Sequence, residues 1–432
     1  MSPEKSFPPP SGARPDAQEV MDRCDELAAI SFLRHGIERT YLTPEHAKHN
    51  ALAAEWMKEA GMQVRVDPAG TLIGRMEGSE PGLPAVVIAS HLDTVPNAGR
   101  YDGILGVLSG IAVARRLRDR AGELPFAVEV CAYGDEEGVR FGATLLGSRA
   151  MAGSWNEGWM DLEDEHGVTL EQAFRDFGLD PSQVATAAKR AEDVVAYLEI
   201  HIEQGPFLEA ADQSLGVVTA IAGARRLALQ IHGDARHAGG TPYARRKDAL
   251  VGAAIAVQAI ERIGRETGVI ATVGQLEAHP GAVNVVPGRV DFSLDLRAAD
   301  DALQARTWTR ILQEIESTCA SRGLTLTWEQ IHSAPTVTCA PWVMDAVVDG
   351  IAATGDDAPM RLWSRAGHDA MAMAAVTDIG MIFVRCEDGI SHHPNESVLV
   401  EDVAAGLDAL EATVWSLAER VRAGRAPADG RP

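Results

Sequence analysis

The sequence predicts an α/β protein that has a mostly parallel sheet and a second, smaller α+β domain inserted into the first. In the first half of the chain, buried-looking apolar runs alternate with helical stretches. That alternation favours a parallel sheet covered by helices. After Ala222 the runs alternate in polarity residue by residue, which is typical of a sheet with one covered face.

The first part of the chain opens with an expected helix. It begins at Thr43, with Pro44 in its first turn, and ends at Gly61, because proline suits a first helical turn and glycine a helix end. Ile104–Leu117 has apolar residues at helical spacing. Residues 143–193 are expected to be mostly helical and polar. Strands are expected at 64–66, 72–76, 86–89, 126–132 and 194–202.

The inserted domain is expected at residues 223–332. Its strands are predicted at 226–232, 273–276, 290–296 and 324–328, and its helices at 249–263 and 300–321. The order β-α-β-β-α-β is typical of a ferredoxin-like domain. The main domain would then comprise residues 19–222 and 333–425, with a strand at 379–385 and a last helix at 401–421.

Composition narrows the classes of partner. The chain has 432 residues with 39 basic and 62 acidic side chains, a net charge of −23. Nucleic acid and anionic membranes repel such a surface. No run of about 20 apolar residues suggests a membrane span. The proline-rich residues 1–18 are interpreted as a disordered tail and not as a signal peptide.

The cysteines suggest the compartment. They are odd in number, lie far apart and form no CxxC pair; they are Cys24, Cys131, Cys319, Cys339 and Cys386. This pattern indicates reduced thiols in a cytoplasm and not a disulfide framework or a thiolate metal site.

Five scattered residues form a candidate metal site: His91, Asp102, Glu137, His201 and His392. Imidazole and carboxylate are ligands of divalent metals, and a pair of ions needs a bridging carboxylate. Three of the five follow predicted strands, where the chemistry of parallel sheets gathers. Asp93 would orient the His91 ring. Any one of the five alone is more often a structural or solvated residue.

Glu136 stands beside Glu137. On extended backbone, adjacent side chains point apart, so one can bind metal while the other faces water. Metal-assisted hydrolysis requires that division between a ligand and a general base. The alternative is a charged surface turn.

Seven segments together resemble the di-metal M20 peptidase and amidase superfamily. Four of them resemble its hydantoinase/carbamoylase branch, which contains N-carbamoyl-L-amino acid hydrolases, allantoate amidohydrolases and β-ureidopropionases. The superfamily segments are 90–95, 101–108 and 135–141, and the branch segments are 201–206, 237–242, 280–287 and 389–396. The resemblance covers about residues 25–420.

The resemblance implies separate roles for the metal-site residues. One ion would be held by His91, His201 and a bridging Asp102. The other would be held by Asp102, Glu137 and His392, where the family pattern alone favours His392 over its neighbour. Glu136 would be the general base. A histidine at position 201, where the peptidase branch commonly has a carboxylate, supports the amidase branch.

The resemblance also implies substrate contacts. His237 would stabilise the oxyanion from the partner subunit, so a homodimer formed through an inserted lid and dimerisation domain is expected. Asn284 and Arg297 would bind the substrate carboxylate, and Gln204 the ureido group. The loop with Gly367 and His368 would approach the substrate. The alternatives are a turn cap for His237 and an Asp295 partner for Arg297.

One residue departs from the family pattern. The loop Ser364–Ala370 has Arg365 where relatives usually have glycine. Arginine adds bulk and charge, and it restricts a backbone that glycine can place at positive φ. We hypothesise that Arg365 reshapes the substrate pocket, so that the preferred substrate side chain is unusual and could be acidic. An outward-pointing surface arginine is the equal alternative.

The sequence thus predicts a cytoplasmic di-metal amidohydrolase that cleaves the linear amide of an N-carbamoyl-L-amino acid or related ureido acid. Zinc is the first choice of metal, with manganese, cobalt or nickel as alternatives. Allantoate or ureidoglycolate amidohydrolase, M20 peptidase or N-acyl amino acid hydrolase, and an inactive binding scaffold are the other readings of the function. The scaffold is disfavoured because the base and all five ligands are present.

Overall fold

The structure is a computed structural model that describes residues 15–424. The chain divides into two compact units. The first holds the chain up to Thr219, Thr338–Leu362 and the part from Gly367 onward, and the second holds Ala220–Val337 and Trp363–Ala366. The second unit extends a few residues beyond the expected 223–332, because its last strand continues to Ala334 and because Ala222 N donates to Ser364 O.

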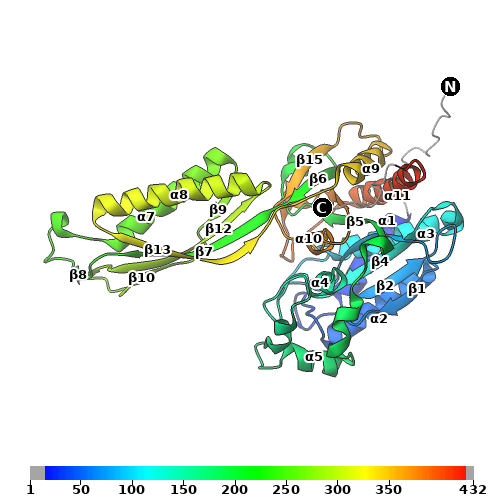
Figure 1. Cartoon of the computed structure of the whole chain (residues 1–432), viewed down its shortest axis with the longest axis horizontal. Helices are drawn as coiled ribbons and strands as arrows, with labels where there is room; N and C mark the ends of the chain where they lie inside the picture. Colours follow the sequence, from blue (N-terminus) through cyan, green and yellow to red (C-terminus); the bar gives the residue numbers. More distant parts are fainter. Residues whose placement is uncertain (1–14, 425–432) are drawn as a thin grey trace. The chain divides into compact units, whose positions relative to one another are not determined.

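The first unit is built on a mixed sheet (Figure 1). Its four central strands are parallel to one another, in the order β4-β3-β5-β16, while β2 and β6 flank them antiparallel. The strands of this sheet are β1 (Gln63–Val66), β2 (Leu72–Met76), β3 (Ala85–His91), β4 (Ala127–Tyr133), β5 (Val194–Ile202), β6 (Leu215–Ile221), β14 (Val337–Thr338), β15 (Met360–Ser364) and β16 (Ile379–Val384). The predicted mostly parallel centre is confirmed.

Long helices and one face of this sheet form the main hydrophobic core of the first unit. The helices that contribute to it are α1 (Pro15–Ala28), α2 (Pro44–Glu59), α3 (Ile104–Leu117), α9 (Pro341–Ala352) and α11 (Val400–Arg422). Alternation along β5 assigns Leu198 and Ile200 to this core and leaves Glu199 and His201 on the other face. The core therefore fixes the strand ends that carry the candidate metal ligands.

Two expectations about the first unit need correction. Residues 143–193 contain only two short α-helices, α4 (Leu146–Met151) and α5 (Leu170–Phe177), separated by 3-10 turns and loops. Three Asn, Thr and Asp N-caps start new short elements there, which explains why no long helix forms. Residues 15–18 of the expected tail belong instead to α1, which begins at Pro15, a residue that suits a first helical position. Residues 1–14 of that expected tail, and residue 425 at the expected end of the main domain, lie outside the described residues 15–424.

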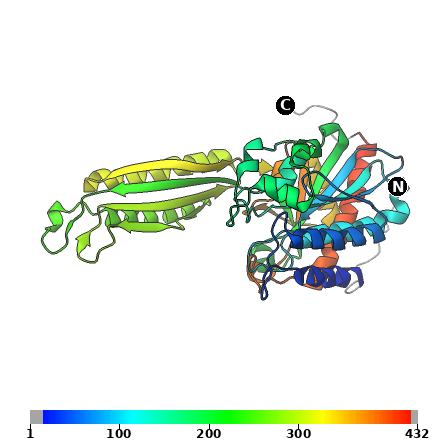
Figure 2. The ribbon, with the colours of Figure 1, turned by 90° about the horizontal axis from the view of Figure 1, so that it is seen from below.

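The second unit is an antiparallel sheet with two long helices on one face (Figure 1). The strand order is β10-β12-β7-β13, with β9 also paired to β12. Figure 2 shows the opposite face of this sheet in front of the helices. The elements are β7 (Gly223–His232), β8 (Arg236–His237), α7 (Ala249–Thr267), β9 (Ile270–Thr272), β10 (Leu276–His279), β11 (Val285–Val286), β12 (Arg289–Ala298), α8 (Asp301–Arg322) and β13 (Thr325–Ala334).

Alternating burial along β12 confirms the predicted pattern in the second unit. Val290, Phe292, Leu294 and Leu296 are buried beneath the helices. The predicted strand 273–276 is wrong, because the chain leaves β9 at Thr272 and pairs again only from Leu276. Two short strands replace the one expected. Over residues 15–424, none of the helices combines the length and the hydropathy needed to cross a membrane.

Candidate metal centre

Two histidines stand at the ends of neighbouring parallel strands. His91 is the last residue of β3, and His201 lies one residue before the end of β5. Each ring is oriented by a backbone carbonyl, since Nδ1 of His91 lies 3.0 Å from Asp93 O and Nδ1 of His201 lies 2.9 Å from Ile202 O. A ring that donates from Nδ1 leaves the Nε2 lone pair available for a metal ion.

Asp102 lies between two histidines. His201 Nε2 is 3.3 Å from Asp102 Oδ1, and His392 Nε2 is 2.9 Å from Asp102 Oδ2. The His392 nitrogen is also 3.3 Å from Glu137 Oε1. Ligand atoms of His91, Asp102 and His201 lie within 4.8 Å of one another, as do those of Asp102, Glu137 and His392. The sequence-derived candidates thus form two adjoining groups that share Asp102.

The turn after β4 carries Glu136 and Glu137. It is a bend and not the extended backbone expected, and it begins at Asp135 with φ 62°. The backbone amides of Glu136 and Glu137 both donate to the carboxylate of Asp93, at 3.1 Å each. Asp93 therefore orients the His91 ring with its carbonyl and holds the two glutamates with its side chain, which is more than the single role expected of it.

The pKa shifts follow from burial and crowded charge. Burial raises the pKa of Glu136 well above its usual range, and burial together with Asp102 raises the pKa of Glu137 to about 7. Burial opposes the charge on His91, but the carboxylates of Asp93, Glu136 and Asp102 outweigh it and hold the pKa of His91 well above its usual range. Excess buried negative charge of this kind suits bound cations.

Gly103 makes room for the His91 ring. A Cβ at Gly103 would lie 2.4 Å from His91 Nε2, and the residue has φ 75°. Both the close approach and the positive φ require glycine. The helix α3 begins at the next residue, so this glycine is needed both at the start of the helix and for the position of the His91 ring.

A buried polar layer lies beneath His201. The His368 ring packs edge-on against the His201 ring, with centroids 4.6 Å apart, and its Nδ1 is 3.9 Å from Glu199 Oε1. Glu199 accepts hydrogen bonds from Ser90 Oγ and Tyr197 Oη. The His368 side chain is 2% exposed. His368 therefore packs against a candidate ligand in the interior. The expected contact with substrate would instead need His368 on an open surface.

Gln204 contacts the shared carboxylate. Its Nε2 donates to Asp102 Oδ1 at 3.0 Å and to Ser391 Oγ at 3.1 Å. Its Oε1 is buried and has no hydrogen-bond partner within residues 15–424. Gln204 also has φ 54°, a conformation that non-glycine residues rarely adopt. The side chain is held with a free acceptor beside the candidate metal site.

His237 and Asn284 are neighbours in the second unit. Strand β8 pairs with β11, and Ala238 N donates to Asn284 O at 2.9 Å. The His237 ring is exposed, and its Nδ1 accepts a hydrogen bond from Gly240 N at 3.0 Å. His237 therefore caps this turn, as the alternative to a substrate contact predicted. Because Nδ1 accepts this hydrogen bond, the proton of the neutral ring is on Nε2, which remains available as a donor.

Arg297 and Arg365 are neighbours too. Arg297 makes two hydrogen bonds to Asp295, at 3.1 and 3.0 Å, and its Nη1 donates to Arg365 O at 2.8 Å. The Arg365 guanidinium stacks over the Trp363 ring at 4.5 Å. Arg365 is absent from the positive-φ residues of the described chain, so its backbone does not need a glycine. The expected Asp295 partner of Arg297 is found.

The pair His237 and Asn284 lies at the opposite end of the second unit from the pair Arg297 and Arg365. Arg297 pairs with Ala224 and Arg289 pairs with His232, after which the chain continues to β8 and His237. At about 3.3 Å per residue, the stretch of β12 from Arg289 to Arg297 alone covers about 26 Å. Within one chain, His237 and Arg297 therefore cannot contact the same small molecule.

Sequence reasoning missed two buried acids, Glu199 and Glu396. Glu396 accepts hydrogen bonds from the backbone amides of Tyr101 and Asp102. Glu396 closes a motif that the sequence singles out, but a local pattern cannot show which distant amides a carboxylate will contact.

Comparison with known proteins agrees with this geometry. The pattern of peptidase family M20/M25/M40 matches residues 87–416. An N-carbamoyl-L-amino acid amidohydrolase of Geobacillus stearothermophilus is 41% identical over 89% of this chain and 94% of its own. A probable allantoate deiminase of Oryza sativa subsp. japonica is 38% identical over 90% of this chain and 86% of its own. The structure of a hydantoinase/carbamoylase family amidase from Burkholderia multivorans, 35% identical, matches with a TM-score of 0.86 and covers 94% of this chain and 99% of that one.

Proposed function

Because the chain belongs to peptidase family M20/M25/M40, we propose that it hydrolyses the linear amide of an N-carbamoyl-L-amino acid or a related ureido acid. The products would be the amino acid, carbon dioxide and ammonia. One observation carries the proposal: the buried Asp102 lies between His201 and His392, with Glu136 and Glu137 on the adjoining turn. Relatives with this activity match nearly the whole chain.

We propose that the site holds two divalent ions. The donor set fits them, because the oriented imidazoles and crowded carboxylates described above are ligands that zinc and similar metals accept. His91, His201 and Asp102 would hold one ion, and Asp102, Glu137 and His392 the other. Bound there, the ions would polarise the substrate carbonyl and lower the pKa of the attacking water. Zinc is proposed first, with manganese, cobalt or nickel as alternatives.

Glu136 is the proposed proton carrier. Burial raises its pKa well above the usual range of a carboxyl, which makes the carboxylate a stronger proton acceptor than an exposed one. Glu136 would take a proton from the attacking water and give it to the nitrogen that leaves. Gly367 lies next to it, since a Cβ there would be 4.0 Å from Glu136 Oε1. The loop 367–370 would bound the reacting end of the substrate.

Gln204 is proposed to receive the ureido group. Its Oε1 is the buried acceptor without a partner noted above, and an unmade buried hydrogen bond is unfavourable. A ureido N–H supplies the missing donor. A peptide substrate has a carbon atom at the position where a carbamoyl group has its terminal NH₂, so an acceptor that faces this position favours the carbamoyl substrate over a peptide.

A homodimer is proposed from the second unit. His237 offers an Nε2 donor for the oxyanion, but it lies beyond the Arg289 end of β12, which is itself about 26 Å from Arg297, at the end remote from the connections to the first unit. Both can serve one substrate only if His237 comes from the partner chain. Helix α7 also exposes three apolar side chains that a partner could cover: Leu250, Val251 and Ile255. We interpret this unit as a ferredoxin-like lid and dimerisation domain.

Arg297 and Asn284 are the proposed carboxylate-binding residues, Asn284 also from the partner. Arg297 donates to the backbone carbonyl of Arg365, and the Arg365 guanidinium stacks over the Trp363 ring; a second cationic side chain in the same loop supports a substrate with a second acidic group. Replacing Arg365 with glycine is then expected to shift preference from acidic towards neutral carbamoyl amino acids. Identical profiles for the two proteins would show that Arg365 has no role in specificity.

The test of the proposed function is a substrate panel. The purified protein, loaded with zinc or manganese, is assayed for ammonia release from carbamoyl amino acids, allantoate and ureidoglycolate, and for amino acid release from peptides and N-acyl amino acids. Turnover of carbamoyl amino acids is expected. Allantoate is the second candidate, because several relatives are named allantoate deiminases. Exclusive turnover of peptides would contradict the proposal.

Glu136→Gln tests the mechanism. The variant is expected to lose activity by about 10²-fold or more while it keeps its metal content, because Glu136 is a base and not a proposed ligand. Activity that persists would contradict the assigned base.

The cytoplasmic location remains a proposal that rests on the thiols: each cysteine is buried and free, which suits a reducing compartment.

A further inference from the structure

Glu396 joins two loops that are far apart in the sequence. Its Oε1 accepts the backbone amides of Tyr101 and Asp102, at 2.7 and 3.1 Å. Its Oε2 accepts the hydroxyl of Ser391, at 3.1 Å. The Glu396 side chain is buried. One carboxylate therefore holds the backbone of one proposed ligand, Asp102, and the residue that precedes another, His392.

The loop before Asp102 packs tightly against the Glu396 side chain. A Cβ at Gly99 would lie 2.3 Å from Glu396 Cδ, so the loop before Asp102 approaches the carboxylate as closely as a glycine permits. Ser391 Oγ is also 3.2 Å from Asp102 Oδ2 and accepts from Gln204 Nε2. The hydroxyl thus connects Glu396 to the shared carboxylate directly.

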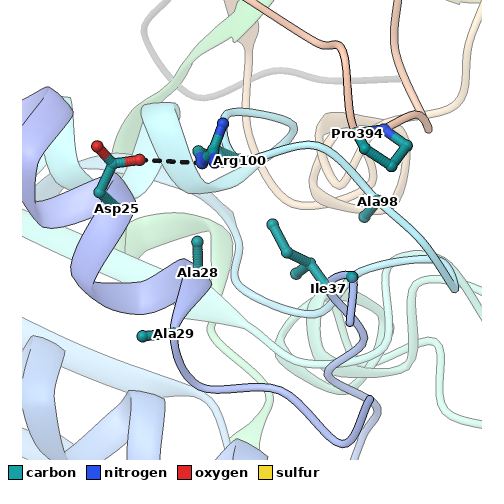
Figure 3. A pocket seen from close by; sticks show the side chains of 8 residues that line it. Asp25, Ala28, Ala29, Ile37, Ala98, Arg100 and Pro394 are labelled. Carbon is teal, nitrogen blue, oxygen red and sulfur yellow. Dashed lines mark ion pairs between the residues drawn. The ribbon is translucent and has the colours of Figure 1, made fainter. Parts of the chain in front are cut away.

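The His392 loop needs such an anchor. The His392 side chain is 47% exposed, and its backbone has φ 56°. An exposed side chain on a rarely populated backbone conformation is not fixed by its own packing. Pro394 of this loop and Ala98 and Arg100 of the Asp102 loop line one cavity of about 530 Å³ (Figure 3). The Glu396 hydrogen bonds join the same two loops at Asp102 and at Ser391, the residue before His392.

We propose that Glu396 is a positioning residue that holds Asp102 and His392 at the spacing a shared metal ion requires. The inference rests on the proposed two-metal site. The spacing in question is the 2.9 Å between His392 Nε2 and Asp102 Oδ2. Without the carboxylate, two buried amides lose their acceptor and the His392 loop loses its tie to Asp102. Glu396 touches neither substrate nor metal in this proposal.

The test measures metal binding without substrate. Glu396→Ala, Glu396→Gln and Ser391→Ala are compared with wild type by equilibrium dialysis against zinc and by the visible spectrum of the cobalt-loaded protein. The matched control is Glu387→Ala, an exposed glutamate on the same loop. Removing a group that orients ligands typically weakens metal binding about 10–100-fold. Glu396→Ala is therefore expected to lose affinity for one of two ions by at least about tenfold and to change the cobalt spectrum.

The other variants sharpen the result. Glutamine keeps one oxygen for the two amides, so Glu396→Gln is expected to retain most of the affinity, and Glu387→Ala all of it. Ser391→Ala is expected to weaken one ion even if Glu396→Ala fails to fold. Wild-type affinity and spectrum in Ser391→Ala, or in a folded Glu396→Ala, would overturn the proposal. Wild-type protein that binds two ions but hydrolyses no ureido acid would refute the proposed function and leave the role of Glu396 standing.

Discussion

A mixture of two inactive variants, Glu136→Gln and His237→Ala, is expected to recover about a quarter of wild-type activity if the chain forms the proposed two-fold dimer. Alone, Glu136→Gln lacks the base, which typically costs about 10²–10⁴-fold. His237→Ala lacks an oxyanion donor, which typically costs about 10²–10³-fold. The recovery depends on the strand register, which puts His237 beyond the Arg289 end of β12, about 26 Å along that strand from Arg297.

The magnitude follows from counting sites. With random pairing of equal amounts, half of the dimers contain one chain of each variant. In such a dimer, one site combines the intact Glu136 of one chain with the intact His237 of the other, and the second site lacks both. Half of the sites in half of the dimers are therefore complete. If His237 served its own chain, every site would carry one defect and no activity would return.

The assay uses two purification tags, so that mixed dimers are isolated from co-expressed chains and tested for ammonia release. In the isolated mixed dimers about half of wild-type activity is expected, because every dimer then has one complete site. A mixture of Glu136→Gln and His392→Ala is the control. Both residues belong to the first unit, so each site of a mixed dimer keeps one substituted residue and no complete site can form. Background activity in tag-verified mixed dimers of Glu136→Gln and His237→Ala would refute the assignment of His237 to the partner's site.

Three further outcomes are expected. Gly103→Ala should lower thermal stability and metal content together, because its Cβ would lie 2.4 Å from His91 Nε2 at φ 75°; strain of this kind costs roughly 1–3 kcal/mol. Metal-free protein should become less stable as pH rises from about 5 to 8, since burial raises the pKa of Glu199 to about 8 and that of Asp369 to about 7. The folded state then binds more protons than the unfolded state over that window, and melting curves that rise with pH would contradict the assigned burial. Arg365→Gly should shift the substrate profile towards neutral side chains, as a competition assay between acidic and neutral carbamoyl amino acids would measure.

Local patterns were sufficient for most elements. The predicted ranges of β2, α3 and β5 match the structure residue for residue, because each is a continuous apolar run or a helical periodicity bounded by polar turns. Prediction failed where short elements follow one another, at 143–193 and at 273–276. There, capping residues and edge pairing decide the conformation, and neither leaves a periodic signal.

The sequence by itself determined the candidate ligands, the candidate base and the class of chemistry, because each residue lies in a short motif whose residue types dictate what they can bind. Only the tertiary structure decided how these parts are held. It placed Glu396 against the amides of Tyr101 and Asp102, nearly 300 residues away in the chain, and it put His368 beneath His201. It also separated His237 from Arg297, because strand register sets distances that no local motif contains.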